Sequence, residues 1–394
     1  MTSLSKSSEL SVCVWFITSN NWTCNYWKGA PMANAALIAY NVASFICGLF
    51  VLEFGADKFI DHTAIVAERT GIPESVIGLL TAGAEWEELA VVVVCILRNR
   101  TSLAVGNIIG SSISNILGAF SLGLVFRGDE EVMVFDASAR AYTLGMLLIT
   151  GSVVALQAFN PSGLSTVFGG ILIAIFTLYV GSVAYLIYKG HLTAPESDSE
   201  SDSDSESDEE SIHDASESNQ VNSTTPLLAT DGALPASRHK YSIPYHVAIL
   251  LLGFLAILLS SFVLSNASSS IAEESGISEV LFGVVFLSIA TTLPEKSIAV
   301  MSGSRNRTGI MVANTVGSNI FLLTLCLGIL WVSTAGDYNG DTINIVELGV
   351  LLGSSLFMTL VVWFGARFSR LAGVVMLVGY VAFLVLEFTT IGHT

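Results

Sequence analysis

Long apolar runs recur from one end of the chain to the other, and short polar stretches separate them. Each run holds roughly 20 residues, which as a helix is enough to cross a hydrocarbon core of about 30 Å. The runs lie at residues 34–54, 74–97, 102–126, 139–158, 164–188, 244–265, 278–302, 307–333, 344–364 and 370–390. The pattern therefore predicts an all-α polytopic membrane protein with ten transmembrane helices.

One longer polar stretch divides these runs into two groups of five. We expect four regions from it. They are a lumenal or extracellular N-terminal segment at 1–33, a first five-helix unit at 34–189, a disordered acidic cytosolic linker at 190–241 and a second five-helix unit at 242–394. Between the first two runs, residues 55–75 mix charged and apolar positions at helical spacing, so we expect this segment to lie along the membrane interface.

Composition supports the membrane interpretation. The mean hydropathy is +0.68, with 52% hydrophobic and only 12% charged residues, which excludes a soluble globular protein. The formal net charge is -17, but residues 196–217 hold eleven acidic residues and no Lys or Arg, so the rest of the chain is near -6. The acidity therefore belongs to the linker, and nucleic acid is excluded as a partner. The expected surroundings are the lipid bilayer.

The basic residues predict the orientation. If the N-terminus lies outside the cytosol, eleven Lys and Arg residues fall on the cytosolic side and four on the other. Cytosolic loops carry the excess of these residues, so this orientation is favoured. Because each half contains an odd number of helices, the second half enters the membrane from the opposite side, and the two halves are inverted relative to one another.

The two halves also share a sequence pattern. Residues 76–120 contain AGAEWEE, RNRTS and GNIIGSS, and residues 280–328 contain ATTLPE, RNRTG and ANTVGSN in the same order. Two separated copies of one unit indicate an internal repeat. Inverted repeats with polar or glycine-rich interruptions at matching positions are typical of secondary transporters whose site lies near the membrane midplane.

Acidic residues within apolar helices point to the chemistry of this site. Glu85, Glu87 and Glu88 lie in the first copy, where three carboxylates would cost roughly 8 to 10 kcal/mol to insert, so a bound cation is the expected compensation. Glu85 and Glu88 are three residues apart and should share a helix face, with Glu87 directed elsewhere. Glu295 of the second copy aligns with Glu88.

If the two repeats face each other, their polar residues form one metal site. We expect Glu88 and Glu295 to come together, with hydroxyl, amide and further carboxylate oxygens around them. The expected additional ligands are Glu85, Ser111, Asn115, Thr291, Thr292 and Ser318. Oxygen ligands without sulfur or imidazole suit hard cations such as calcium, sodium or magnesium. We expect transported ions, with no resident cofactor and no enzymatic activity.

Backbone breakers accompany the acidic residues. Gly83 and Pro294 should interrupt their helices and free carbonyl oxygens. Gly110 and Gly317 should let neighbouring helices approach closely. Lys296 directly follows Glu295, and two interpretations remain open: it extends toward the interface, or it neutralises the surplus acid at Glu85 or Glu87.

These motifs resemble the alpha repeats of the calcium/cation antiporter superfamily, of the Na⁺/Ca²⁺ exchanger type. The resemblance is strongest in GADKFIDHTAIVAERTGIPESVIGL, GNIIGSS, and TTLPE followed by NTVGSN. It implies ten helices in two inverted halves, alternating access at one central site, and Glu88 and Glu295 as principal ligands. The chain departs from the family pattern at Glu85, where a hydroxyl is usual, and at Leu322, where an acidic or amide side chain is usual.

The favoured function is therefore an antiporter that moves calcium against sodium or protons, in a vacuolar or other endomembrane, with the plasma membrane as the alternative. Two neighbouring carboxylates at Glu85 and Glu88 disfavour double ionisation, which would suit protons. An antiporter for magnesium or manganese and a non-transporting ion sensor remain open. The linker predicts two further partners: a kinase for its serines, and a sorting adaptor at Leu227 and Leu228, which follow an acidic region.

Overall fold

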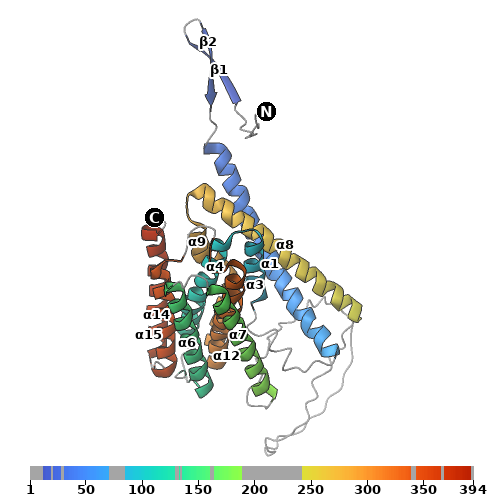
Figure 1. Cartoon of the computed structure of the whole chain (residues 1–394), viewed down its shortest axis with the longest axis vertical. Helices are drawn as coiled ribbons and strands as arrows, with labels where there is room; N and C mark the ends of the chain where they lie inside the picture. The colour runs from blue at the N-terminus through green and yellow to red at the C-terminus, as the bar shows by residue number, and fades with distance from the viewer. Residues whose placement is uncertain are drawn as a thin grey trace, which may run out of the picture.

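The computed structural model describes residues 12–18, 21–27, 31–70, 85–128, 133, 135–159, 164–188, 242–338, 343–364 and 368–391. The linker at 190–241, the proposed sorting residues Leu227 and Leu228, and Gly83 lie outside these ranges. Figure 1 gives the arrangement of the described elements.

The first half begins with an antiparallel hairpin and continues as helices. Its elements are β1 (Val12–Thr18), β2 (Asn21–Trp27), α1 (Pro31–Arg69), α3 (Trp86–Leu97), α4 (Thr101–Ile113), the π-helix η1 (Ser114–Phe120), α5 (Ser121–Val125), α6 (Ala137–Phe159) and α7 (Ser165–Tyr188). The described residues of the predicted membrane spans are almost all helical. The hairpin precedes them and was not expected from the sequence.

The second half is helical throughout its described part. Its elements are α8 (Ile243–Ser275), α9 (Glu279–Phe282), the π-helix η2 (Gly283–Leu287), α10 (Ser288–Thr291), α11 (Leu293–Ser304), α12 (Thr308–Ile320), the π-helix η3 (Phe321–Cys326), α13 (Leu327–Thr334), α14 (Ile345–Phe364), α15 (Ser369–Leu386) and the π-helix η5 (Glu387–Ile391). Three of the four π-helices interrupt the membrane-spanning segments that carry the repeats.

Each of the ten apolar runs has a helical counterpart. In the described residues, eight helices are long and apolar enough to cross a membrane, and α9 to α11 form a ninth, bent span. The tenth predicted span, 74–97, is described from Glu85 onward and contains α3. The protein is therefore an all-α polytopic membrane protein, as the hydropathy pattern predicted.

The first helix differs from the prediction. We expected a span that ends at residue 54 and an interfacial segment after it, but α1 continues without a break to Arg69, and residues 35–67 form one membrane-length helix. No proline interrupts this stretch, so nothing ends the helix at the predicted boundary. The consequence is that Glu53 and Asp57 lie within a transmembrane helix.

The helix contacts between the two halves are symmetric: each contact has a counterpart when the five spans of one half are exchanged for those of the other. The first span, α1, packs along the sixth, α8, which Figure 1 shows as two long crossing helices. The fourth span, α6, packs on the ninth, α14. The third span contacts the tenth through α5 and α15, and the fifth contacts the eighth through α7 and α13. Exchanging the halves maps this set of contacts onto itself, as expected for inverted repeats of five helices.

The two spans that carry the GNIIGSS and ANTVGSN motifs occupy the centre of the molecule. In an 18-residue window of the span 101–125, 89% of the residues are buried, and in such a window of the span 308–334 the share is 78%, compared with half or less in the other spans. A Cβ added at Gly110 would lie 2.6 Å from the Val284 Cα, and one at Gly283 would lie 2.7 Å from the Leu103 carbonyl oxygen. The close helix approach expected at Gly110 is therefore confirmed.

Candidate cation site

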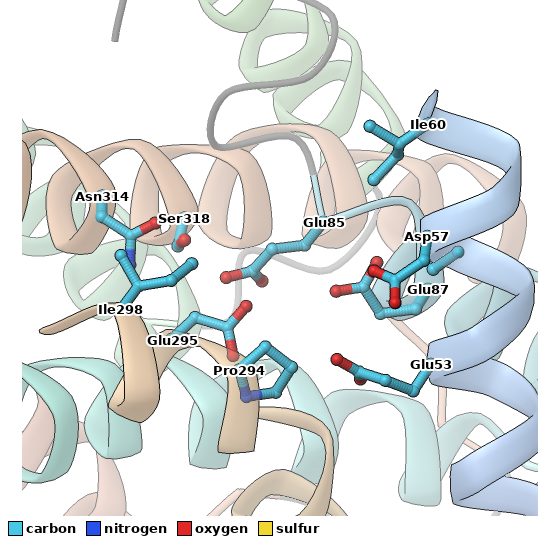
Figure 2. Close-up of a pocket in the computed structure, with 11 residues that line it drawn as sticks. Glu53, Asp57, Ile60, Glu85, Glu87, Pro294, Glu295, Ile298, Asn314 and Ser318 are labelled. Carbon is cyan, nitrogen blue, oxygen red and sulfur yellow. The ribbon is translucent and has the colours of Figure 1, made fainter. Parts of the chain in front are cut away.

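A cavity of about 160 Å³ lies where the two halves meet. Its wall combines five carboxylates with amide, hydroxyl and apolar side chains. The lining residues are Glu53, Ala56, Asp57, Ile60, Glu85, Glu87, Pro294, Glu295, Ile298, Asn314 and Ser318. They come from α1, from the start of α3, from the start of α11 and from α12, as Figure 2 shows. Both repeats therefore contribute to one cavity.

The break in the seventh span places Glu295 on this wall. The helix formed by residues 279–291 and the helix formed by 293–304 meet at an angle of 49°. Pro294 stands in the first turn of α11, where its missing N–H costs no hydrogen bond, and Glu295 follows it. The interruption predicted at Pro294 is thus confirmed.

The glutamates of the first repeat adopt a different arrangement from the one expected. Glu85 precedes α3 and has a non-helical backbone, with φ -79° and ψ 75°, so helical spacing does not apply between it and Glu88. Glu85 and Glu87 line the cavity and Glu88 does not. Glu85 and Glu88 nevertheless both bond to one row of side chains on the third span, Glu85 to Asn115 and Glu88 to Asn107 and Ser111, which agrees with the predicted shared face. The prediction did not include Glu87 in the cavity lining.

Glu85 and Glu295 present open oxygens to the cavity. Figure 2 shows their carboxylates directed toward each other. Their side chains are 3% and 7% exposed, and one Oε2 atom on each has no hydrogen-bond partner. The other Glu85 oxygen accepts a hydrogen bond of 3.2 Å from Asn115 Nδ2. A buried carboxylate oxygen without a partner is costly, and a cation would satisfy it.

Glu88 lies behind the cavity wall and is enclosed by donors. It is 1% exposed and accepts hydrogen bonds from Ser111 Oγ at 2.8 Å, from Thr291 Oγ1 at 2.6 Å and from Asn107 Nδ2. Thr291 belongs to the second half, so this carboxylate joins the two repeats. In this structure Glu85 is the first-repeat residue that lines the cavity with Glu295, and the expectation that Glu88 and Glu295 together bind a cation stays a prediction.

Thr292 and Lys296 belong to a separate cluster. The Thr292 hydroxyl lies 2.9 Å from Ser114 Oγ and contacts the Lys296 ammonium, and neither residue lines the cavity. In the described part of the chain the one ion pair within 4.0 Å joins Lys58 and Asp61, so Lys296 forms no contact ion pair with Glu85 or Glu87. The contact is therefore absent, and the interpretation that Lys296 neutralises the surplus acid at Glu85 or Glu87 from a greater distance stays a prediction.

The predicted ligands therefore divide into two groups. Glu85, Glu295 and Ser318 line the cavity. The others do not line it: hydrogen bonds join Asn115 to Glu85 and join Ser111 and Thr291 to Glu88, and Thr292 contacts Ser114 and Lys296. This adjoining set of Glu88 with Asn107, Ser111 and Thr291 is called the inner cluster below.

Sequence reasoning missed four polar residues of the cavity: Glu53, Asp57, Glu87 and Asn314. Glu53 and Asp57 stand four residues apart, a spacing that places both on one helix face. This spacing can be read from the sequence, but it indicates a shared helix face only if the helix continues beyond residue 54. Asn314 lies four residues before Ser318 on α12 and points to the same cavity (Figure 2).

The acidic side chains of the cavity do not by themselves form a metal-binding site. Among the residues that the structure describes, no three histidine, cysteine or acidic side chains converge closely enough to hold a metal ion by themselves. The carboxylates are spread around the wall. Hydroxyl, amide and backbone oxygens would have to complete the shell of a hard cation, since such ions take six to eight oxygens.

Comparisons with known proteins agree with this architecture. A family model described as sodium/calcium exchanger protein matches residues 40–185 and 245–389. The inner membrane protein YrbG of Escherichia coli is 28% identical over 348 residues, which cover 87% of this chain and 95% of that protein. The sodium/calcium exchanger MaX1 of Methanosarcina acetivorans is 22% identical over 367 residues, covering 89% and 99%.

Solved structures share the fold. The sodium-calcium exchanger NCX_Mj, soaked with 10 mM Na⁺ and zero Ca²⁺, superimposes with a TM-score of 0.51 at 19% identity, and the match covers 90% of this chain and 99% of that one. At this level of identity the match concerns the arrangement of the helices. It extends over both halves.

Proposed function

Since the chain belongs to the sodium/calcium exchanger family, we propose that it is an antiporter that exchanges calcium for sodium or protons across a membrane by alternating access. One observation carries the proposal. Two buried carboxylates, Glu85 from the first half and Glu295 from the second, line one cavity between the halves, and each has an oxygen without a hydrogen-bond partner. A site shared by two inverted halves can face either side of the membrane as one half moves against the other.

The ligands that we propose for calcium are of two kinds. Glu85 and Glu295 supply charge at the cavity, and Ser318 and the side-chain carbonyl of Asn314 supply neutral oxygens. These groups number fewer than the six to eight oxygens that calcium takes, so backbone carbonyls and water would complete the shell.

The inner cluster offers further ligands. A hydroxyl that donates to a carboxylate can rotate and offer a lone pair to a cation held by that carboxylate. Ser111 and Thr291 both donate to Glu88 in this way. We therefore retain Glu88, Ser111 and Thr291 as ligands that a cation reaches when these hydroxyls turn, with Asn115 positioning Glu85.

The charge of the cavity favours the binding of further cations or protons in addition to calcium. Five carboxylates line it, and a single calcium ion carries two positive charges, so three carboxylates exceed what calcium balances. In a membrane interior such a surplus is expensive unless further cations or protons bind. Leu322, which corresponds to Asn115 in the second repeat, is fully buried and provides no oxygen ligand for sodium.

The test is transport by the full chain in proteoliposomes. Uptake of ⁴⁵Ca²⁺ is measured with internal sodium at constant pH, and then with a proton gradient and no sodium. We expect uptake under at least one gradient and its loss in E295Q. Glu347 is a matched control, because it is an equally buried glutamate on α14 that does not line the cavity, so E347Q should retain uptake.

Each result of the transport measurement decides one part of the proposal: the counter-ion, the transported divalent cation or the antiport itself. Sodium-driven uptake makes sodium the counter-ion, and proton-driven uptake makes Glu85 the next residue to test. Magnesium or manganese uptake without calcium uptake would establish the alternative substrate. Calcium binding without transport of any of these ions would contradict the antiporter and favour an ion sensor. Expression of the full chain with a fluorescent tag tests our further proposal of a vacuolar or other endomembrane.

A further inference from the structure

The Lys296 ammonium is surrounded by oxygen atoms, as an unattached monovalent cation would be in a binding site. Its ammonium contacts four oxygens: Ser114 Oγ at 2.9 Å, the Thr292 carbonyl at 3.1 Å, the Ile289 carbonyl at 3.4 Å and Thr292 Oγ1. All four are neutral oxygens. We propose that these oxygens form a monovalent-cation site, which the side chain of Lys296 occupies as a built-in cation.

The hydroxyl protons of this cluster all point away from the ammonium. Thr292 donates its proton to the Ser288 carbonyl at 2.6 Å, so in the 2.9 Å contact between Ser114 and Thr292 the donor is Ser114. Tyr380 donates to Ser114 Oγ at 3.0 Å. With these protons assigned, both hydroxyl oxygens turn only lone pairs toward Lys296, which is the arrangement that a metal cation needs.

The backbone contributes to the site through the break in the seventh span. The Ile289 and Thr292 carbonyls lie on either side of the end of α10, at Thr291, where the helix axis bends by 49° before α11. Carbonyls at a broken membrane helix are the usual backbone ligands of monovalent cations in transporters.

Lys296 lacks the carboxylate contact that a buried ammonium normally has. Among the described residues no acidic oxygen lies within 4.0 Å of it. Its charge nevertheless acts through space on Glu295, Glu88 and Glu85. A cation that is coordinated by neutral oxygens and balanced by carboxylates at a distance behaves as a bound sodium or potassium ion would at the same place.

The surrounding backbone makes room for the lysine side chain. A Cβ added at Gly118, in the π-helix η1, would lie 3.3 Å from the Lys296 Cε atom. In the aligned first repeat, Lys296 corresponds to Leu89, Thr292 to Glu85 and Ser114 to Phe321. The cluster therefore exists once in the molecule, and the fixed positive charge breaks the symmetry of the two halves.

The experiment removes the built-in cation and looks for its replacement. Binding of ²²Na⁺ and ⁸⁶Rb⁺ to the purified full chain is measured for the wild type, K296A and K296S. We expect the truncated variants to bind one more monovalent ion per chain than the wild type. K58M, which removes an equal charge from the exposed Lys58–Asp61 pair, should show no gain. In K296A/S114A the gained site should weaken by about tenfold, the loss expected for about 1.4 kcal/mol of ligand energy.

Two results would overturn the proposal. The first is a folded K296A or K296S with no additional monovalent ion. The second is that neither K296A nor K296S folds in sodium, potassium or rubidium chloride, whereas K296Q does fold. The amide of K296Q can keep hydrogen bonds to the cluster but carries no charge. Folding of K296A in one of these salts but not in N-methyl-D-glucamine chloride would support it. The measurement concerns binding alone, so calcium transport and this site can fail independently.

Discussion

Two glutamates three residues apart, Glu85 and Glu88, are both almost completely buried but differ in their surroundings. Glu88 accepts hydrogen bonds from three side chains, one of which comes from the opposite half. Glu85 accepts one long hydrogen bond and leaves an oxygen unpartnered in the cavity. Burial alone therefore does not identify a ligand. The carboxylate with an open oxygen faces the cavity, and the enclosed carboxylate joins the two halves.

The strongest test of this comparison is E88A. The substitution leaves Asn107 Nδ2 and Ser111 Oγ without their acceptor, while the Thr291 hydroxyl keeps the Leu287 carbonyl at 3.0 Å. Buried donors that lose a charged partner cost about 1 to 3 kcal/mol each, so we expect a loss of several kcal/mol in stability. The measurement is thermal unfolding of the purified protein in detergent. A melting temperature equal to that of the wild type would contradict the structural role of Glu88.

The complementary change is E85Q, which should act on binding more than on stability. It preserves the shape of the side chain and an oxygen that Asn115 can reach, but removes a charge from the cavity. We expect calcium affinity to fall by about 10- to 100-fold, equivalent to about 1.4 to 2.7 kcal/mol, with little change in melting temperature. Isothermal titration with calcium checks the first quantity. A destabilisation as large as that of E88A would remove the distinction between the two glutamates.

A third test acts on the close contact that positions the inner cluster. In G110A the new methyl group would lie 2.6 Å from the Val284 Cα and 2.8 Å from Ser288 Oγ, which forces α4 away from η2. Overpacking of this kind costs about 1 to 3 kcal/mol. Gly349 on α14 is the control, since a Cβ there meets nothing within 4 Å. Equal melting temperatures for G110A and G349A would contradict the tight approach.

The smallest effect is expected at the α1 side of the cavity. Glu53 and Asp57 line it, but both are more exposed than Glu85 and Glu295. E53Q and D57N should change calcium affinity only about two- to fivefold, and the change should decrease with added salt because screening weakens exposed charges. D61N, on the same helix but outside the cavity, is the control. A loss of binding as large as that of E85Q would place the site closer to α1.

The sequence predicts the architecture well because the membrane restricts it. A span must be long, apolar and helical, so the ten runs and the break at Pro294 could be located without coordinates. The pairing of the two repeats followed from their shared motifs. The hairpin at Val12–Thr18 and Asn21–Trp27 lies outside these constraints and was not predicted.

The assignment of individual ligands was less successful, because it depends on where a helix starts. Because α3 begins at Trp86, the backbone of Glu85 is not helical, and the direction of its side chain could not be predicted from helical spacing. The continuity of α1 decides whether Glu53 and Asp57 face lipid, water or the cavity. The position of Lys296 also depends on the π-helix η1, which has no reliable sequence signature, whereas the bend after α10 accompanies Pro294.

The exchange of contacts between the halves also constrains biogenesis. When the ribosome has completed only α1 to α7, α1 still lacks α8, and α7 still lacks α13. Glu88 is then already in the membrane without the hydroxyl of Thr291. The first five spans alone therefore lack these contacts, and the cavity between the halves is complete only once α11 and α12 are present.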